Sequence, residues 1–241
     1  MLHMKEQKNH DYLQERLYRP IRRKRFLRSM TLAGGSLILG LTACRKEGQP
    51  GSGGVTDVGS ADIGILNLAY ALEQIGAAFY IKANAAYYNN APLSEKRVLF
   101  DIMHHEMAHR DFLKALLGSN AIRELQFDFS FVDFTSRDSV LKTGKLLEDT
   151  DVTFYNGIAP FLQSTDHLKI PTKIVSVEAR HSAALRDLLY PKSAEFAGDD
   201  IVDPLTGLEF SFTPNSTANG QSIVATINTF LLTKISALQL P

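Results

Sequence analysis

The stretch HHEMAHRDFL, residues 104–113, contains two overlapping metal-binding patterns. Read from His105 it is His-Glu-x-x-His, which places two histidines on one helix face as in zinc metalloproteases. Read from Glu106 it is Glu-x-x-His, half of the ligand set of a carboxylate-bridged pair of metal ions in a helical bundle. Other features of the sequence are needed to decide which of these two metal sites the stretch forms.

The helix that carries this stretch is expected to run from about Ser94 to Gly118, with an apolar stripe on one side. Helical spacing from Ile102 and Met103 leads to Glu106 and His109, so both polar residues fall inside the stripe. A buried carboxylate without a partner costs several kcal/mol. Some group must therefore compensate the charge of Glu106.

Three more helices are expected: one from Asp62 to about Tyr88, one that starts at about Asp138, and one from about Pro171 to Tyr190. The helix from Asp62 places Glu73 on its inner face, and the helix from Asp138 places Glu148 there. The helix from Pro171 repeats the Glu-x-x-His spacing in its apolar stripe, with Glu178 and His181. Residues 119–136 form a long crossover before the third helix of the bundle. The inner polar residues of the four helices are Glu73, Glu106, His109, Glu148, Glu178 and His181. One glutamate from each of two helices and one Glu-x-x-His from each of the other two is the set that a di-iron or di-manganese bundle needs.

The chain resembles the ferritin-like superfamily, and more closely its exported ferritin-like domain proteins related to desiccation-associated proteins. The stretches that carry this resemblance are DIGILNLAYALEQIGAAFY (62–80), HEMAHRDFL (105–113), LLEDTDVTFYNGIAPFL (146–162) and VEARHSAALRDLL (177–189). The resemblance implies an all-α, ferritin-like four-helix bundle over residues 61–190, with a long crossover between helices 2 and 3. It also implies that the six inner residues are metal ligands. Asp149 and Asp151 lie close enough to Glu148 in the sequence to be confused with it.

Two alternatives remain open for the inner residues. A zinc protease would use His105 and His109 as ligands and Glu106 as the base, but no His-x-x-Gly-x-x-His extension follows HEMAH. A metal-free bundle would let the inner polar residues pair with one another. Tyr80 and Tyr155, each seven residues after an inner glutamate, are either core tyrosines or hydrogen-bond partners and electron donors of the site.

The start of the chain is typical of an exported lipoprotein. Residues 1–44 hold nine Lys/Arg against three Asp/Glu, and they end in an uncharged apolar run of about 15 residues before Cys44. This run is shorter than the roughly 20 residues of a membrane span, so we predict a signal peptide with a lipobox over residues 1–44. Cys44 is the only cysteine, which excludes an intramolecular disulfide, and its predicted task is to carry a lipid.

The expected location is therefore the bacterial cell envelope, on the periplasmic or surface side of a membrane. The arginines resemble a twin-arginine signal imperfectly, so the export route stays open. Because the basic cluster lies in the removable segment, we expect no nucleic-acid partner. Residues 45–60 are predicted to be a flexible linker.

Residues 191–241 are predicted to form a loop region followed by a fifth helix over about 222–238. This helix is expected to pack on the bundle, and a homodimer through the same face is the alternative.

The predicted cofactor is a pair of Fe or Mn ions. The expected chemistry is ferroxidase or peroxide-detoxifying redox activity in stress protection, with a small oxidant or a metal ion as substrate. The rival function is a non-catalytic structural or stress protein of the envelope.

Overall fold

The computed structural model of the chain describes residues 54–198, 201 and 222–240. The predicted signal peptide, Cys44 and most of the predicted linker lie outside these residues. The described residues form five α-helices, three short 3-10 turns and one pair of two-residue strands. None of the described helices combines the length and the apolar character that a membrane span requires.

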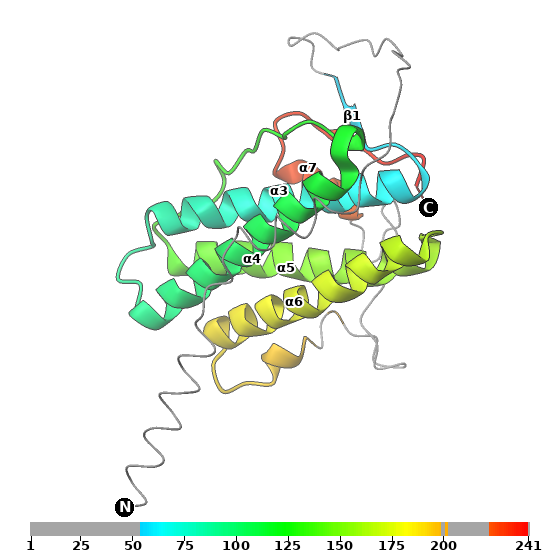
Figure 1. Ribbon diagram of the computed structural model, residues 1–241. Coiled ribbons are helices and arrows are strands. Elements are labelled where there is room, and N and C mark those ends of the chain that lie inside the picture. Colours follow the sequence, from blue (N-terminus) through cyan, green and yellow to red (C-terminus); the bar gives the residue numbers. More distant parts are fainter. Residues whose placement is uncertain (1–53, 199–200, 202–221, 241) are drawn as a thin grey trace, which may run out of the picture. The chain divides into compact units, whose positions relative to one another are not determined.

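Four long helices form the bundle (Figure 1). Helices α3 (Ala61–Ala85) and α4 (Leu93–Leu117) pack as one hairpin, and α5 (Arg137–Ile158) and α6 (Thr165–Leu189) pack as the other. The predicted all-α, ferritin-like architecture is confirmed. Helix α3 is the most enclosed of the four, because every residue from 64 to 77 is buried.

The connection between α4 and α5 is the predicted long crossover. It begins with a 3-10 turn, Gly118–Asn120, and then follows α3 in an irregular path to Ser136. The side chain of Asn67 accepts a hydrogen bond from Ile122 N at 2.9 Å, and that of Gln74 accepts one from Leu125 N at 2.8 Å. These bonds satisfy backbone groups of a segment that has no ladder of its own.

The fourth bundle helix begins earlier than the sequence predicted. Helix α6 starts at Thr165 and runs through Pro171 instead of beginning there. The Asp62 carboxylate, at the start of α3, accepts hydrogen bonds from the backbone N–H groups of Gln163 (2.8 Å) and Ser164 (3.0 Å). The Ser164 side chain also caps the helix locally, by accepting a hydrogen bond from His167 N. The long-range contact with Asp62 adds to this cap, and no local sequence pattern reveals that contact.

The C-terminal helix is shorter than predicted. Helix α7 spans Ile223–Thr229 and packs against α3 and α5, which confirms the expected packing on the bundle. The chain then turns, because the Asn228 amide bonds both the N–H and the carbonyl of Ile235. Strand β2 (Ile235–Ser236) follows and pairs in parallel with β1 (Thr56–Asp57). Leu238, at the end of the longer helix predicted over about 222–238, lies outside α7 and is 85% exposed.

Candidate metal centre

The structure brings all six predicted site residues together in the middle of the bundle. Glu73 comes from α3, Glu106 and His109 from α4, Glu148 from α5, and Glu178 and His181 from α6. The four glutamates are fully buried, whereas the side chains of His109 and His181 are 15% and 6% exposed. Four separate helices therefore place four carboxylates and two imidazoles in one interior space.

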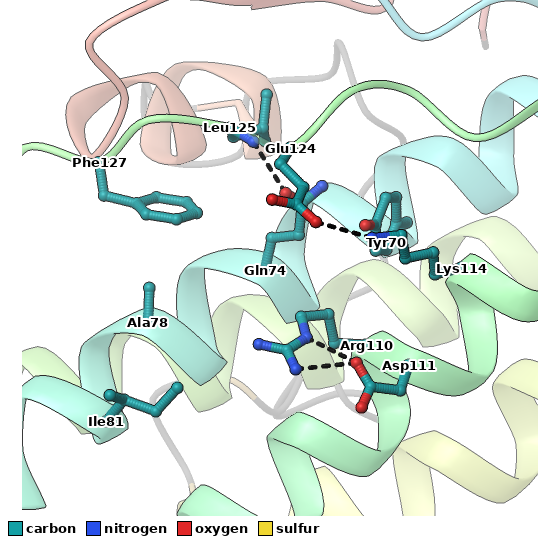
Figure 2. Close-up of a pocket in the computed structure, with 10 residues that line it drawn as sticks. All are labelled: Tyr70, Gln74, Ala78, Ile81, Arg110, Asp111, Lys114, Glu124, Leu125 and Phe127. Carbon is teal, nitrogen blue, oxygen red and sulfur yellow. Dashed lines mark hydrogen bonds and ion pairs between the residues drawn. The ribbon is translucent and has the colours of Figure 1, made fainter.

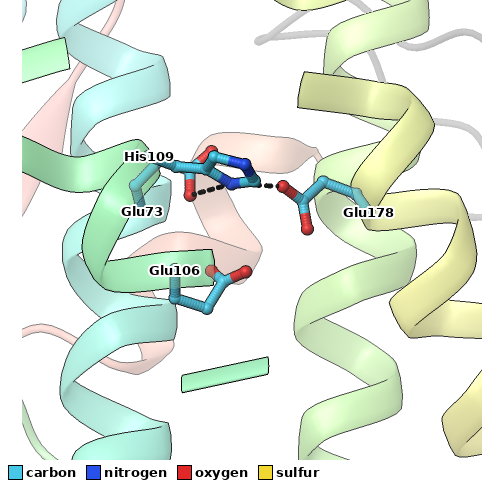
Figure 3. Close-up of side chains that lie close together, drawn as sticks. All are labelled: Glu73, Glu106, His109 and Glu178. Atoms are coloured by element: carbon cyan, nitrogen blue, oxygen red, sulfur yellow. Dashed lines mark ion pairs between the residues drawn. The ribbon is translucent and has the colours of Figure 1, made fainter. Parts of the chain in front are cut away.

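These residues form two overlapping groups, in each of which one ligand atom per residue lies within 4.8 Å of the others. The first group consists of Glu73, Glu106, His109 and Glu178, which Figure 3 shows converging from three helices. The second group consists of Glu106, Glu148, Glu178 and His181. Glu106 and Glu178 belong to both groups. Each half thus has one glutamate and one histidine of its own and shares two glutamates with the other half.

Many of the buried oxygens in this cluster have no hydrogen-bond partner among the described residues. Both carboxylate oxygens of Glu106 are in this state, as is one oxygen each of Glu73, Glu148 and Glu178. Buried polar atoms are paired in the great majority of cases. Three of these oxygens lie 2.7–3.4 Å from a histidine Nδ1 without forming a hydrogen bond: Glu73 Oε2, Glu106 Oε1 and Glu178 Oε1. Carboxylate oxygens gathered around one point without hydrogen bonds fit a site that binds cations.

His109 is held by the carboxylates of the first half. Its Nδ1 lies 2.7 Å from Glu178 Oε1 and 3.4 Å from Glu73 Oε2, and the short contact attracts as a pair of charges although it is not aligned as a hydrogen bond. Burial alone would lower the pKa of this imidazole, but the two carboxylates raise it to about 10. The metal-free centre therefore holds His109 as a cation.

His181 has the same role in the second half. Its Nδ1 lies 2.9 Å from Glu178 Oε2, 3.1 Å from Glu148 Oε2 and 3.4 Å from Glu106 Oε1. Burial opposes protonation, and these carboxylates outweigh it, so the pKa of His181 lies well above its usual range. Glu178 is buried too, yet its contacts with both imidazoles lower its pKa to about 2. It is the carboxylate most strongly held in its charged form.

The other inner carboxylates are protonated more readily. Burial, and then the charge of Glu178 and the other glutamates nearby, raises the pKa of Glu106 well above its usual value. Burial also raises the pKa of Glu73, and it raises that of Glu148 to about 7. In the metal-free protein these glutamates therefore bind protons more readily than free glutamates do, and metal ions would have to displace those protons.

Asp149 and Asp151, the two neighbours confusable with Glu148, have different surroundings. Asp149 binds the fully buried Arg186, with Nη2 to Oδ2 at 2.8 Å, and accepts a hydrogen bond from Ser182. Asp151 is 2% exposed, and burial together with the charge of Glu73 raises its pKa well above the usual value. Neither belongs to the two ligand groups, so the geometry favours Glu148 at this position.

A glycine makes room for the shared Glu106 carboxylate. A Cβ atom placed on Gly76 would lie 3.2 Å from Glu106 Cδ and closer still to Oε2. Gly76 was not among the residues predicted from the sequence. The available signal was a glycine in a helix interior, which costs about 1 kcal/mol relative to alanine, three residues after an inner glutamate.

Two buried tyrosines, Tyr80 and Tyr155, lie next to glutamates of the cluster. The Tyr155 hydroxyl donates a hydrogen bond of 2.5 Å to Glu73 Oε1, so Tyr155 is a hydrogen-bond partner of the site. The Tyr80 hydroxyl approaches Gly144, where an added Cβ would lie 2.9 Å away. Burial raises the pKa of both phenols well above the usual value, and the charge of Glu148 adds to this for Tyr80 and that of Glu73 for Tyr155. Both phenols therefore remain protonated, but of the two hydroxyls only that of Tyr155 has a hydrogen-bond partner among the described residues.

The geometry also decides how HHEMAHRDFL is best read. His105 is exposed, and its Nδ1 lies 2.8 Å from His181 Nε2. Among the described residues the candidate ligand groups contain His109 and not His105. The Glu-x-x-His pattern thus fits the structure better than the His-Glu-x-x-His pattern of a zinc protease.

A cavity of about 410 Å³ lies away from the cluster, between α3, α4 and the crossover (Figure 2). Its polar lining is largely self-paired, since Arg110 binds Asp111 and Lys114 binds Glu124. The inner glutamates and histidines do not line it.

A bundle of four helices with a long crossover, built around buried carboxylates and histidines able to hold metal, defines the class of ferritin-like carboxylate proteins. Residues 61–191 match the family profile described as the ferritin-like domain. The chain belongs to this ferritin-like domain family. A comparison with curated proteins found no match.

Proposed function

We propose that the bundle binds two divalent metal ions, Fe or Mn, at the six inner residues. In this assignment Glu73 and His109 would hold one ion, Glu148 and His181 would hold the other, and both ions would share Glu106 and Glu178. The observation that carries the proposal is the sharing of Glu106 and Glu178 between two otherwise separate ligand groups. Pairing of the inner residues with one another, as in a metal-free bundle, does not require this arrangement.

The donor set and the charge fit such ions. Carboxylate oxygens mixed with imidazoles suit Fe or Mn better than ions that prefer thiolates. Four ionised glutamates balance the charge of two divalent cations. The Glu106 oxygens, which form no hydrogen bond, and the space left by Gly76 are features that cations would use.

Two such ions, when bound, supply redox chemistry with dioxygen or peroxide, and we propose ferroxidase or peroxide turnover as the activity. The chain's own residues set the conditions. Burial of the four glutamates excludes bulk water from the centre. Tyr155 orients Glu73 through its hydroxyl. His109 and His181 release their Nδ1 protons when cations replace them, which makes metal binding dependent on pH.

We further propose that the protein is exported and attached to a membrane through lipidated Cys44. The support is the basic, then apolar sequence before the single cysteine. A role in stress protection at the envelope, through redox activity or as a structural protein, is consistent with this placement.

Metal analysis of the purified full-length protein tests the centre. After reconstitution with Fe(II) or Mn(II) we expect two equivalents per chain. Glu106→Ala should lose both ions because it removes a shared ligand, whereas Glu73→Ala should retain one. Glu124→Ala, which changes a glutamate that is 77% exposed, is the matched control and should retain both. A wild-type protein that stays metal-free would overturn the proposal.

Activity is tested separately on the metal-loaded protein. Turnover of hydrogen peroxide or oxidation of Fe(II), lost in Glu106→Ala and kept in Glu124→Ala, would support an enzyme. Two bound ions without either turnover would point to the non-catalytic envelope role.

A further inference from the structure

The two halves of the candidate centre differ in how their histidines are held. His181 Nε2 lies 2.8 Å from His105 Nδ1, and the two rings meet edge to edge, within 10° of parallel and with centroids 5.1 Å apart. His109 contacts Glu73 and Glu178 through Nδ1, and its Nε2 has no partner among the described residues. Of the two imidazoles, only that of His181 therefore has a partner at Nε2, the nitrogen on the far side of the ring from the Nδ1 that contacts the carboxylates.

The two Glu-x-x-His pairs also differ in the residue that precedes each glutamate. His105 precedes Glu106, and Val177 precedes Glu178 at the corresponding place on α6. A valine offers no acceptor for an imidazole N–H. The two halves share their ligand types but not this neighbour.

The contact determines which nitrogen of His181 is free. Nδ1 faces the carboxylates, so it is the atom that would meet a metal ion, and Nε2 must then carry the ring proton. An acceptor fixed at Nε2 selects this tautomer and sets the plane of the ring. His105 Nδ1 is in place to accept a hydrogen bond from His181 Nε2–H, and His105 is itself exposed to solvent.

We propose that His105 is a positioning residue that holds His181 ready for metal, so that the half formed with Glu148 depends on His105 for its affinity and the other half does not. The inference rests on the proposed dinuclear function. Loss of a partner behind a metal-binding histidine typically costs 10–100-fold in affinity. The expected effect is therefore a loss of about that size at one of the two ions.

The test is an equilibrium titration of the full-length protein with Mn(II), in which EPR counts the free ion. His105→Ala removes the acceptor. His105→Asn keeps one, because an amide oxygen can stand near the place of Nδ1. His104→Ala is the matched control, since His104 is also exposed and its Nδ1 contacts only the carbonyl of Phe100, at 2.9 Å.

We expect His105→Ala to bind one ion with wild-type affinity and the other about 10–100-fold more weakly. His105→Asn should recover most of this loss, and His104→Ala should match the wild type. If His105→Ala binds both ions as tightly as the wild type, or weakens both equally, the inference is wrong while the dinuclear centre stands. A wild-type protein that binds no Mn(II) would remove the proposed function, and this inference with it.

Discussion

Replacing Gly76 with alanine should separate the folding of the bundle from the assembly of its centre. The added Cβ would lie 3.2 Å from Glu106 Cδ. Favourable carbon contacts occur at about 3.5–4.0 Å, and the carboxylate oxygen is closer than that carbon. The Glu106 side chain would have to turn away from its position between the two halves.

The expected effect on folding is small, because the clash is with the flexible end of a side chain. Alanine is about 1 kcal/mol more favourable than glycine inside a helix, and an off-rotamer glutamate costs about 0.5–1.5 kcal/mol. These effects largely cancel, so the free energy of unfolding of the metal-free protein should change by less than about 1 kcal/mol. The effect on metal is large, because Glu106 is shared. The affinity for each of the two ions should fall by at least about 10–100-fold, which is the loss typical when a hydrogen-bond partner of a metal ligand is removed.

Urea denaturation of the metal-free protein and Mn(II) titration measure these two quantities on one sample. Ala78→Gly, two residues further along α3, is the control, since it should lose about 1 kcal/mol of stability and keep both ions. The reasoning is refuted if Gly76→Ala binds two ions with wild-type affinity. It is also refuted if the metal-free variant loses several kcal/mol of stability, because Gly76 would then serve packing instead of the centre.

The pair of Asp149 and Arg186 should matter for stability and not for metal. Asp149→Ala removes a carboxylate that binds the buried Arg186, so urea denaturation should show a loss of stability, at most about 3–5 kcal/mol, with both ions retained. In the metal-free protein the pKa of Glu148 is raised to about 7, so the folded state binds more protons than the unfolded state between its usual pKa of 4.5 and pH 7. Stability should therefore fall as pH rises through this window, by roughly 3 kcal/mol at most from this group. His109, with its pKa raised to about 10, extends the fall to alkaline pH; thermal melts at several pH values check both, and a metal-loaded sample should show a smaller fall. Asp62→Ala removes the acceptor for two backbone N–H groups before α6, which should cost about 1–3 kcal/mol and speed hydrogen exchange in the first turn of α6 and not in α4.

The order and the inner faces of the four helices could be predicted because helical periodicity is local. Side chains three and four residues apart share a face wherever the helix lies in the fold. That rule was enough to select Glu106 with His109 and Glu178 with His181, and to place one further glutamate on each remaining helix. The structure brings all of these side chains together.

Helix ends were predicted less well, because they depend on distant partners. Helix α6 begins before Pro171, where Ser164 caps it and Asp62, about a hundred residues earlier, binds the backbone of residues 163 and 164. Helix α7 ends at Thr229 since the Asn228 side chain bonds the backbone of Ile235. Neither contact is visible in the propensity of the local sequence.

The sequence by itself determined which residue types face the interior, because an α-helix of known register fixes that face. Only the tertiary structure decided that Glu106 and Glu178 are shared by two groups, that Gly76 makes room for one of them, and that His105 lies behind His181. These are relations between atoms on different helices. They depend on the distance and rotation between helix axes, which packing of the whole core sets and no local pattern encodes.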